Sequence, residues 1–269
     1  MSKPIKLFIV EGEKRESRFI HEMANCFFEK GRYESKIINL SADQNIYMLF
    51  KKLEEDDFET DIVEIVRENI DTAREKLTGI SRQSVDEVFL FFDYDIHQDN
   101  LKKDKGEESA DAILRRMLSV FDNETENGKL YISYPMVEAL YDYKTSACDA
   151  FSKCYFPIEN VQDYKRQAGE SNANASQHFD FLKWQDVLNV FYLKLKCLFD
   201  LDQLEYEYYR RKITPLMIYK KEKDLLNEKN VIFVLSAFPE FLFDYFKKDF
   251  WNKMTPIKRF NYSYCVKSN

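Results

Sequence analysis

The strongest strand signal in the chain is Val85-Asp86-Glu87-Val88-Phe89-Leu90-Phe91-Phe92-Asp93, where a continuous apolar run ends in an acid. Such a run indicates a strand that is buried on both faces, as in a parallel sheet covered by helices. The shorter run Lys6–Val10 predicts a second strand of this kind. Further strands are expected over Ser35–Leu40, Lys129–Tyr134 and Val231–Leu235.

Apolar residues at helical spacing separate these strands. Helices are expected over Glu13–Lys30, Asn45–Leu77 (in two pieces), Ser109–Phe121, Val137–Cys154, Trp184–Tyr209 and Glu240–Phe250. The polar stretches Gln98–Glu107 and Gln162–Gln177 are expected to be loops. The alternation of strands and helices predicts an α/β fold with a mostly parallel sheet flanked by helices.

The pattern also predicts how the chain divides. Residues 1–155 are expected to form the α/β core, and residues 156–230 a helical insertion. Residues 231–269 would supply a strand that completes the sheet, a helix and a basic tail.

The composition excludes several classes of protein. The 269 residues include only 6 glycines and neither of the glycine-rich phosphate loops, which argues against P-loop ATPases and classical dinucleotide enzymes. The five cysteines form no CxxC pair and there are three histidines, so a structural zinc site is poorly supported, and a reducing cytoplasm is expected. No apolar run is long enough for a membrane span, and no signal peptide is expected. The net charge of −7 means that any binding of nucleic acid would need a local basic patch, a metal or a partner.

Two acidic groups follow predicted strands directly: Glu11-Gly12-Glu13 and Asp93-Tyr94-Asp95. Ligands of open α/β sheets gather beyond the carboxyl ends of the strands, so the acids would converge if the two strands are neighbours. Closely spaced carboxylates repel one another unless a cation is present, and Mg²⁺ is the natural cation for such ligands. The alternation of side chains puts Asp93 and Asp95 on the same side of their strand. Alternatively, the acids could simply stabilise the first turn of the next helix, as Glu13 and Glu16 would.

The order of these motifs resembles the TOPRIM fold of topoisomerases, bacterial primases and OLD-family nucleases. The stretch Val10-Glu11-Gly12-Glu13-Lys14-Arg15-Glu16 is most similar to the small RloB-like and OLD-related nucleases. A third element, Ser133-Tyr134-Pro135-Met136-Val137-Glu138-Ala139-Leu140, is similar to their Asn-Pro-x-Phe-Glu-x-Trp segment, although Val137 and Leu140 replace its Phe and Trp. The resemblance covers about Lys6–Leu140.

The resemblance implies site residues. Glu11, Asp93 and Asp95 would bind Mg²⁺ or Mn²⁺, and Glu138 would be a fourth catalytic acid. Lys14 and Lys102 are candidate phosphate contacts. Each has a plainer alternative, because Glu138 could stabilise a helix start and Lys102 could belong to a solvated loop. His97 and Ser236 are weaker candidates near the same site.

The resemblance also implies a function and partners. It predicts a metal-dependent nuclease that acts on DNA or RNA, possibly tRNA, as the effector of a bacterial anti-phage system. Its restraining ABC-type ATPase would be a separate chain, since this chain has no ATP-binding motif. The aromatic segment Trp184–Tyr209 could be core or a docking surface, and a homo-oligomer is possible. The alternatives are an inactive TOPRIM-like module that binds nucleic acid or a partner, and phosphoryl transfer to a small molecule.

Overall fold

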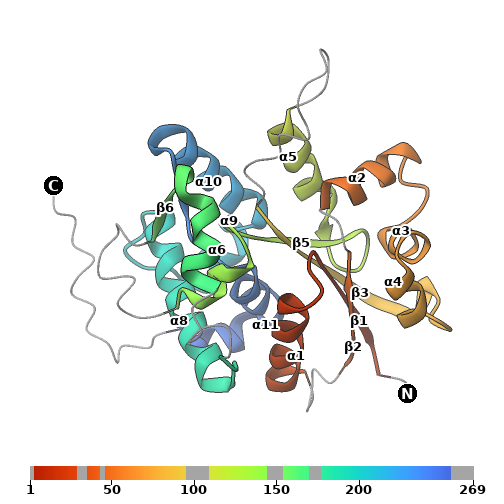
Figure 1. Cartoon of the computed structure of the whole chain (residues 1–269). Coiled ribbons are helices and arrows are strands. Elements are labelled where there is room, and N and C mark those ends of the chain that lie inside the picture. The colour runs from red at the N-terminus through yellow and green to blue at the C-terminus, as the bar shows by residue number, and fades with distance from the viewer. Residues whose placement is uncertain are drawn as a thin grey trace. The chain divides into compact units, whose positions relative to one another are not determined.

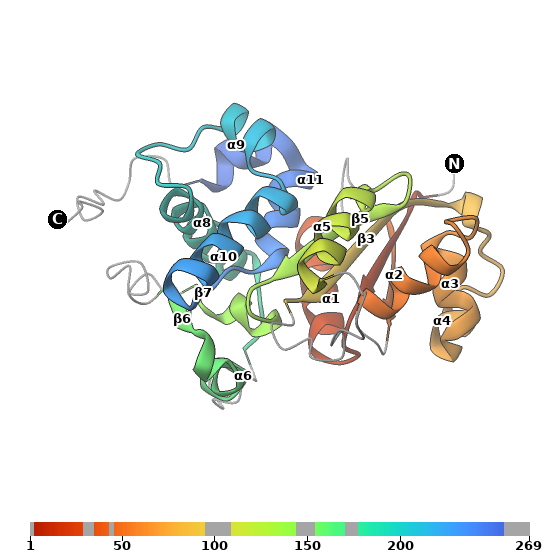
Figure 2. The same cartoon turned by 90° about the horizontal axis from the view of Figure 1, so that it is seen from above.

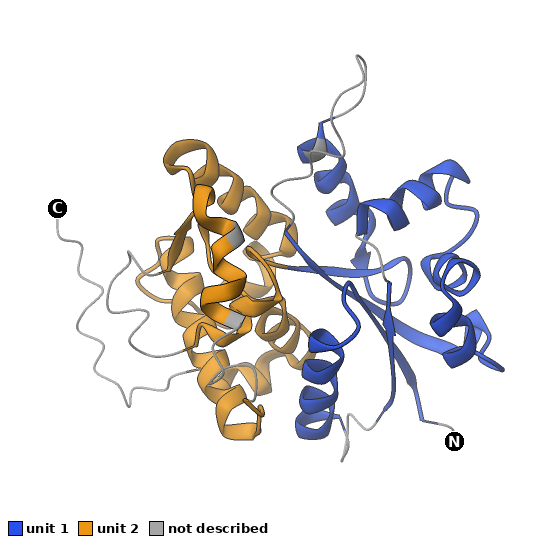
Figure 3. Ribbon diagram, viewed as in Figure 1, with its two compact units in different colours: residues 1–132 blue, residues 133–269 orange. Residues whose placement is uncertain are grey.

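The computed structural model describes residues 3–28, 35–42, 46–94, 109–143, 154–169 and 177–255. The chain forms two compact units, residues 1–132 and residues 133–269, which are coloured blue and orange in Figure 3. This boundary does not coincide with the boundaries expected after residues 155 and 230.

Unit 1 is built on a mostly parallel five-stranded sheet, which confirms the predicted α/β class. Its strand order is β2-β1-β3-β5-β4, and β1 runs parallel to both β2 and β3, whereas β4 runs antiparallel to β5. The strands are β1 (Ile5–Val10), β2 (Lys36–Ser41), β3 (Val85–Asp93), β4 (Asp122–Asn123) and β5 (Gly128–Ser133). Because β1 lies between two strands and under helices, its residues from Leu7 to Val10 are completely buried.

Helices cover both faces of this sheet. Figures 1 and 2 show α1 (Arg15–Phe27) on one face and the connection α2 (Ile46–Glu55), α3 (Ile62–Asn69) and α4 (Asp71–Lys76) on the other. Right-handed crossovers produce this placement, since β1 to β2 and β2 to β3 cross the sheet in opposite directions. The short 3₁₀ turn η2 (Arg82–Ser84) precedes β3, and α5 (Ala110–Val120) precedes β4.

The segment expected as two helical pieces forms three. Asp61 begins α3, because its side chain accepts hydrogen bonds from the backbone N–H groups of Val63 and Glu64. Ile70 has an extended backbone and separates α3 from α4. The first break falls at the acidic run Glu54-Glu55-Asp56-Asp57, where α2 ends, but the second break, at Ile70, carries no strong sequence signal.

Unit 2 is mainly helical and contains a two-stranded antiparallel sheet of β6 and β7. Its elements are η4 (Val137–Tyr141), β6 (Tyr155–Pro157), η7 (Ile158–Asn160), α6 (Val161–Gly169), α8 (Phe181–Leu198), α9 (Tyr206–Lys212), α10 (Pro215–Lys229), β7 (Val231–Phe233) and α11 (Ala237–Met254).

The structure differs from three expectations for this region. The strand near residue 231 forms β7, which pairs with β6 and not with a strand of the main sheet, and the Tyr155 and Phe233 rings lie 5.2 Å apart. Beyond β7, Leu235 forms an isolated antiparallel bridge with Tyr134, directly after β5. The predicted helix over Val137–Cys154 is a single 3₁₀ turn where it is described, and residues 144–153 lie outside the described part. Much of the predicted loop over Gln162–Gln177 is helix α6, whose buried Val161 and Tyr164 face inward at a spacing of three residues.

The aromatic segment of unit 2 forms core. Trp184, Phe191, Tyr206 and Tyr209 are buried, and the Tyr209 ring stacks on Trp251 with centroids 4.7 Å apart. Of the two alternatives for this segment, core or docking surface, core describes most of it. Among the described residues, no helix has both the length and the apolar character needed to cross a bilayer.

Candidate acidic site

Glu11 and Asp93 meet at the carboxyl edge of the main sheet. β1 and β3 are neighbours, and their register pairs Val10 with Phe91. The Glu11 backbone N–H donates to the Phe91 carbonyl at 3.2 Å, which extends the ladder past the end of β1. The Glu11 carboxylate Oε2 then accepts the backbone N–H of Asp93 at 3.2 Å. Two acids that are 82 positions apart in the sequence are thereby brought to one place.

Glu16 belongs to the same turn, although the sequence suggested for it only a role in the first helical turn. Its carboxylate Oε1 accepts the Gly12 backbone N–H at 3.1 Å, and the residue is only 8% exposed. A Cβ atom at Gly12 would lie 2.8 Å from both Glu16 carboxylate oxygens. A side chain at position 12 would therefore push the Glu16 carboxylate out of its present position.

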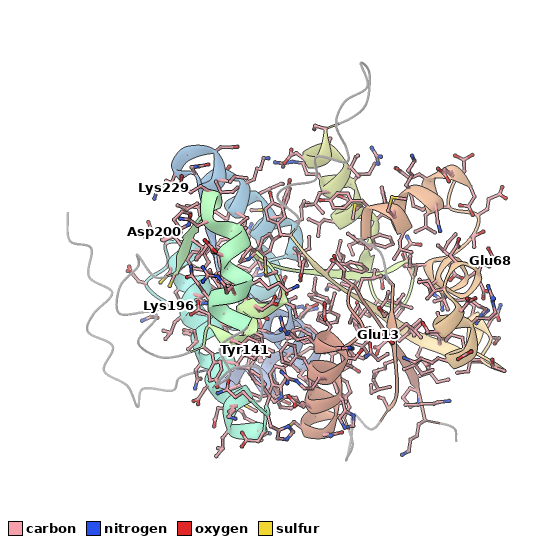
Figure 4. The ribbon with its side chains drawn as sticks, in the orientation of Figure 1. Glu13, Glu68, Tyr141, Lys196, Asp200 and Lys229 are labelled. Atoms are coloured by element: carbon pink, nitrogen blue, oxygen red, sulfur yellow. The ribbon has the colours of Figure 1, made fainter. Side chains whose placement is uncertain are left out.

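Some residues near these acids are held by hydrogen bonds, and others are exposed. The Ser41 hydroxyl donates to the Glu11 carbonyl oxygen at 3.3 Å, so the end of β2 also contacts this turn. Lys14 is exposed at the N-terminal end of α1 and makes no side-chain capping bond. Glu13, which is labelled in Figure 4, is exposed in the turn before α1. The remaining candidates, Asp95, His97 and Lys102, lie outside the described residues.

The donor set suits a hard divalent cation in its chemistry. Glu11 and Asp93 supply carboxylate oxygens from adjacent strand ends, and Mg²⁺ is held by one or two carboxylates and several waters. Within the described residues, no group of three His, Cys, Asp or Glu side chains is close enough to hold a metal ion. Asp95, the third acid that the resemblance nominates, was not part of that search. The metal-binding roles stay predictions.

Glu138 lies in unit 2, within η4. All five residues of this 3₁₀ turn are buried, and Glu138 is 0% exposed. Glu138 does lie in the first turn of this short 3₁₀ helix, as the plainer alternative expects, but its side chain is buried. A fully buried carboxyl is costly to keep unless it has a use, and such groups concentrate at functional sites.

A buried lysine fastens the segment that contains Glu138. Lys194 on α8 is 3% exposed, and its Nζ donates to the Asp142 carboxylate at 2.7 Å and to the Val234 carbonyl at 2.8 Å. Asp142 follows η4 directly, and Val234 follows β7. The sequence reasoning missed Lys194, but a signal exists: it continues the apolar stripe of Val187 and Phe191 on α8 at helical spacing.

Lys194 and Asp142 line a pocket in unit 2. Its walls are formed mainly by apolar side chains of η4 and α8. Ser236, which caps α11 by accepting the Phe238 N–H at 3.4 Å, also lines this pocket.

Two further titratable groups are buried near this pair. Burial raises the pKa of the Glu222 carboxyl well above its usual range, while the Phe233 N–H that it accepts at 2.9 Å and the charge of Lys194 act in the opposite direction. Burial also raises the pKa of the Tyr164 hydroxyl, with a smaller contribution from the nearby Asp142 carboxylate.

Comparisons with known proteins identify no relative. No protein-family model matches the sequence, no curated protein matches it, and no solved structure matches the fold. The functional argument therefore depends on the residues and their arrangement.

Proposed function

We propose that this protein is a divalent-metal-dependent nuclease that hydrolyses phosphodiester bonds of DNA or RNA in the cytoplasm. The observation that carries the proposal is the meeting of Glu11 and Asp93 at the ends of adjacent parallel strands, with the Glu11 carboxylate fixed by the Asp93 N–H at 3.2 Å. The order of the motifs along the sequence, which resembles the TOPRIM nucleases, supports it independently.

Each residue has a role in this proposal. Glu11, Asp93 and Asp95 would hold Mg²⁺ or Mn²⁺, which when bound would polarise the phosphate and lower the pKa of the attacking water. Lys14 and Lys102 would contact the substrate phosphates and stabilise developing negative charge. Glu138 would be a further catalytic acid, as the resemblance implies.

The proposal includes a partner. The resemblance to OLD-related nucleases favours a separately encoded ABC-type ATPase that restrains the nuclease in anti-phage defence. The absence of a phosphate-binding loop from this sequence is compatible with such a partner. Since most of the aromatic segment in unit 2 is core, the partner proposal rests on the resemblance. Co-purification from the native host tests it, and full regulated activity of the isolated chain would contradict it.

A cleavage assay tests the enzymatic proposal. The wild-type protein is incubated with plasmid, single-stranded DNA and total tRNA, with Mg²⁺, with Mn²⁺ and with a chelator. Cleavage of at least one substrate is expected with metal and not with chelator. Glu11→Gln removes the charge at the strand end, and Glu68→Gln is the matched control, because Glu68 is exposed on α3 (Figure 4).

The two variants should separate clearly. Glu11→Gln should lose cleavage, and Glu68→Gln should cleave like the wild type. A well-folded Glu11→Gln protein that still cuts at the wild-type rate would show the metal-nuclease assignment to be wrong.

A further inference from the structure

The segment Ser133–Asp142, which carries Glu138, is fastened to the segment around β7 at both of its ends. At its beginning, Tyr134 and Leu235 exchange two backbone hydrogen bonds of 2.7 and 2.9 Å. The Ser133 hydroxyl also accepts the Ala237 backbone N–H at 3.3 Å. The end of the segment is held by a side chain.

Lys194 provides this second fastening. Its single ammonium group bonds to the Asp142 carboxylate, which belongs to the Glu138 segment, and to the Val234 carbonyl, which belongs to the β7 segment. Val234 is itself fixed, since its N–H donates to the Cys154 carbonyl at 2.8 Å. One buried cation therefore links helix α8 to both segments at once.

Burying a lysine is energetically costly if its role is only structural. A buried ammonium loses its hydration, and replacing a buried ion pair by apolar side chains is often neutral or stabilising. Glu222 reinforces the same place, because its carboxyl accepts the Phe233 N–H at the end of β7. The polar groups of this cluster come from α8, α10 and the residue after η4. Lys194 and Glu222 bond to backbone groups at the end of β7 or directly after it, and Lys194 also bonds to the Asp142 side chain.

We propose that Lys194 is a positioning residue, which holds Asp142 and thereby fixes the orientation of Glu138 for catalysis. The functional half of this inference rests on the proposed nuclease activity. The structural half, that Lys194 holds η4 in place, does not.

Hydrogen exchange tests the structural half on the intact chain. Lys194→Met removes both hydrogen bonds and keeps most of the apolar stem, and Asp142→Asn keeps an acceptor as a milder second variant. Lys196→Met is the matched control, because Lys196 lies on the same helix outside this cluster (Figure 4). The Ala139 and Asp142 amides, which donate within η4, should exchange at least tenfold faster in both variants and unchanged in the control.

Cleavage kinetics test the functional half. Lys194→Met should lower the cleavage rate by about tenfold to a hundredfold, the range expected for a misplaced catalytic group. Glu138→Gln should lower it at least as far. The double variant should be no worse than Glu138→Gln alone, because residues that act through one another are not additive. If Lys194 had only a structural role, the losses of cleavage rate in Lys194→Met and Glu138→Gln would multiply in the double variant.

The outcomes are distinguishable. Unchanged exchange in η4 for both Lys194→Met and Asp142→Asn would overturn the fastening itself. Faster exchange with multiplicative losses of cleavage would overturn the positioning role through Glu138. A wild-type protein that cleaves no nucleic acid would remove the proposed function and the catalytic role of Lys194 together, while the exchange data would still decide the fastening.

Discussion

Replacing Gly12 by alanine is the smallest change that should disable the acidic site. The added Cβ would lie 2.8 Å from both Glu16 carboxylate oxygens, whereas ordinary contact begins at 3.4 Å, so the carboxylate must withdraw by roughly 0.6 Å. The bond that it accepts from the Gly12 N–H would lengthen from 3.1 Å to about 3.7 Å, beyond hydrogen-bonding distance. The turn that carries Glu11 would lose one of its fixed points.

The effect on stability should be modest. Losing a hydrogen bond to a charged group costs about 1.5–3 kcal/mol, and the alanine restores about 0.4–1 kcal/mol by restricting the unfolded chain. Gly12 does not have a positive φ, so backbone strain adds nothing. The net loss of about 1–2 kcal/mol should lower the melting temperature by several degrees. Cleavage should fall more steeply, by about a hundredfold, because catalytic groups tolerate little displacement.

Two further variants isolate the cause. Gly79→Ala is the matched control, since Gly79 has a φ of +74° and nothing within 4 Å of an added Cβ, so it should lose stability through backbone strain and keep its activity. In a Glu16→Ala background, Gly12→Ala should have no further effect on cleavage, because the clash is gone. A Gly12→Ala protein with wild-type cleavage would refute the reasoning.

Three other outcomes follow from the same arrangement. Mg²⁺ at 100 times its Kd should stabilise the wild type by about 2.7 kcal/mol and so raise its melting temperature. Glu11→Gln should lose most of this rise in differential scanning fluorimetry. Because the pKa of the Glu222 carboxyl is raised in the folded state, wild-type stability should fall as pH rises above about 4.5, by up to about 1.4 kcal/mol per pH unit. Denaturant titrations of Glu222→Gln from pH 5 to 8 should lack this component. An identical slope of stability against pH in both proteins would contradict it. Asp61→Ala should destabilise unit 1 by about 1 kcal/mol in urea unfolding, since α3 loses its N-cap, and an unchanged midpoint would contradict that role.

The sequence predicted the sheet and the meeting of Glu11 with Asp93 because both depend on short-range patterns. A run of buried apolar residues indicates a central strand, and parallel neighbours place their carboxyl ends at one edge. The pairing of β6 with β7 was missed for the opposite reason. Each strand has three residues, and Tyr155 pairs with Phe233, so neither length nor proximity in sequence signals the contact.

Two predictions of secondary structure in the second half of the chain also differ from the structure. The apolar spacing of Val137–Tyr141 fits a 3₁₀ turn as well as a helix, and η4 is a turn of five residues. Helix α6 was hidden by its polar composition, because only one narrow side of it is buried. The sequence does show Lys194 as a charged residue within the apolar stripe of α8. Its role becomes apparent only from the structure, which gives its two hydrogen-bond acceptors.

The same kind of hydrogen bond occurs in each of the two units. Glu11, Glu16 and Glu222 each accept a backbone N–H at the end of a strand or in the turn after it, from Asp93, Gly12 and Phe233 respectively. A carboxylate has two oxygens and about four lone-pair positions, so accepting an N–H does not prevent it from meeting a cation. The N–H instead fixes the direction of the carboxylate in advance, and ligands that are oriented by a second hydrogen bond bind and catalyse better than free ones. By this argument the Asp93 N–H fixes the direction of the Glu11 carboxylate in the protein without metal, whereas the buried Glu222 carboxyl holds only the strand.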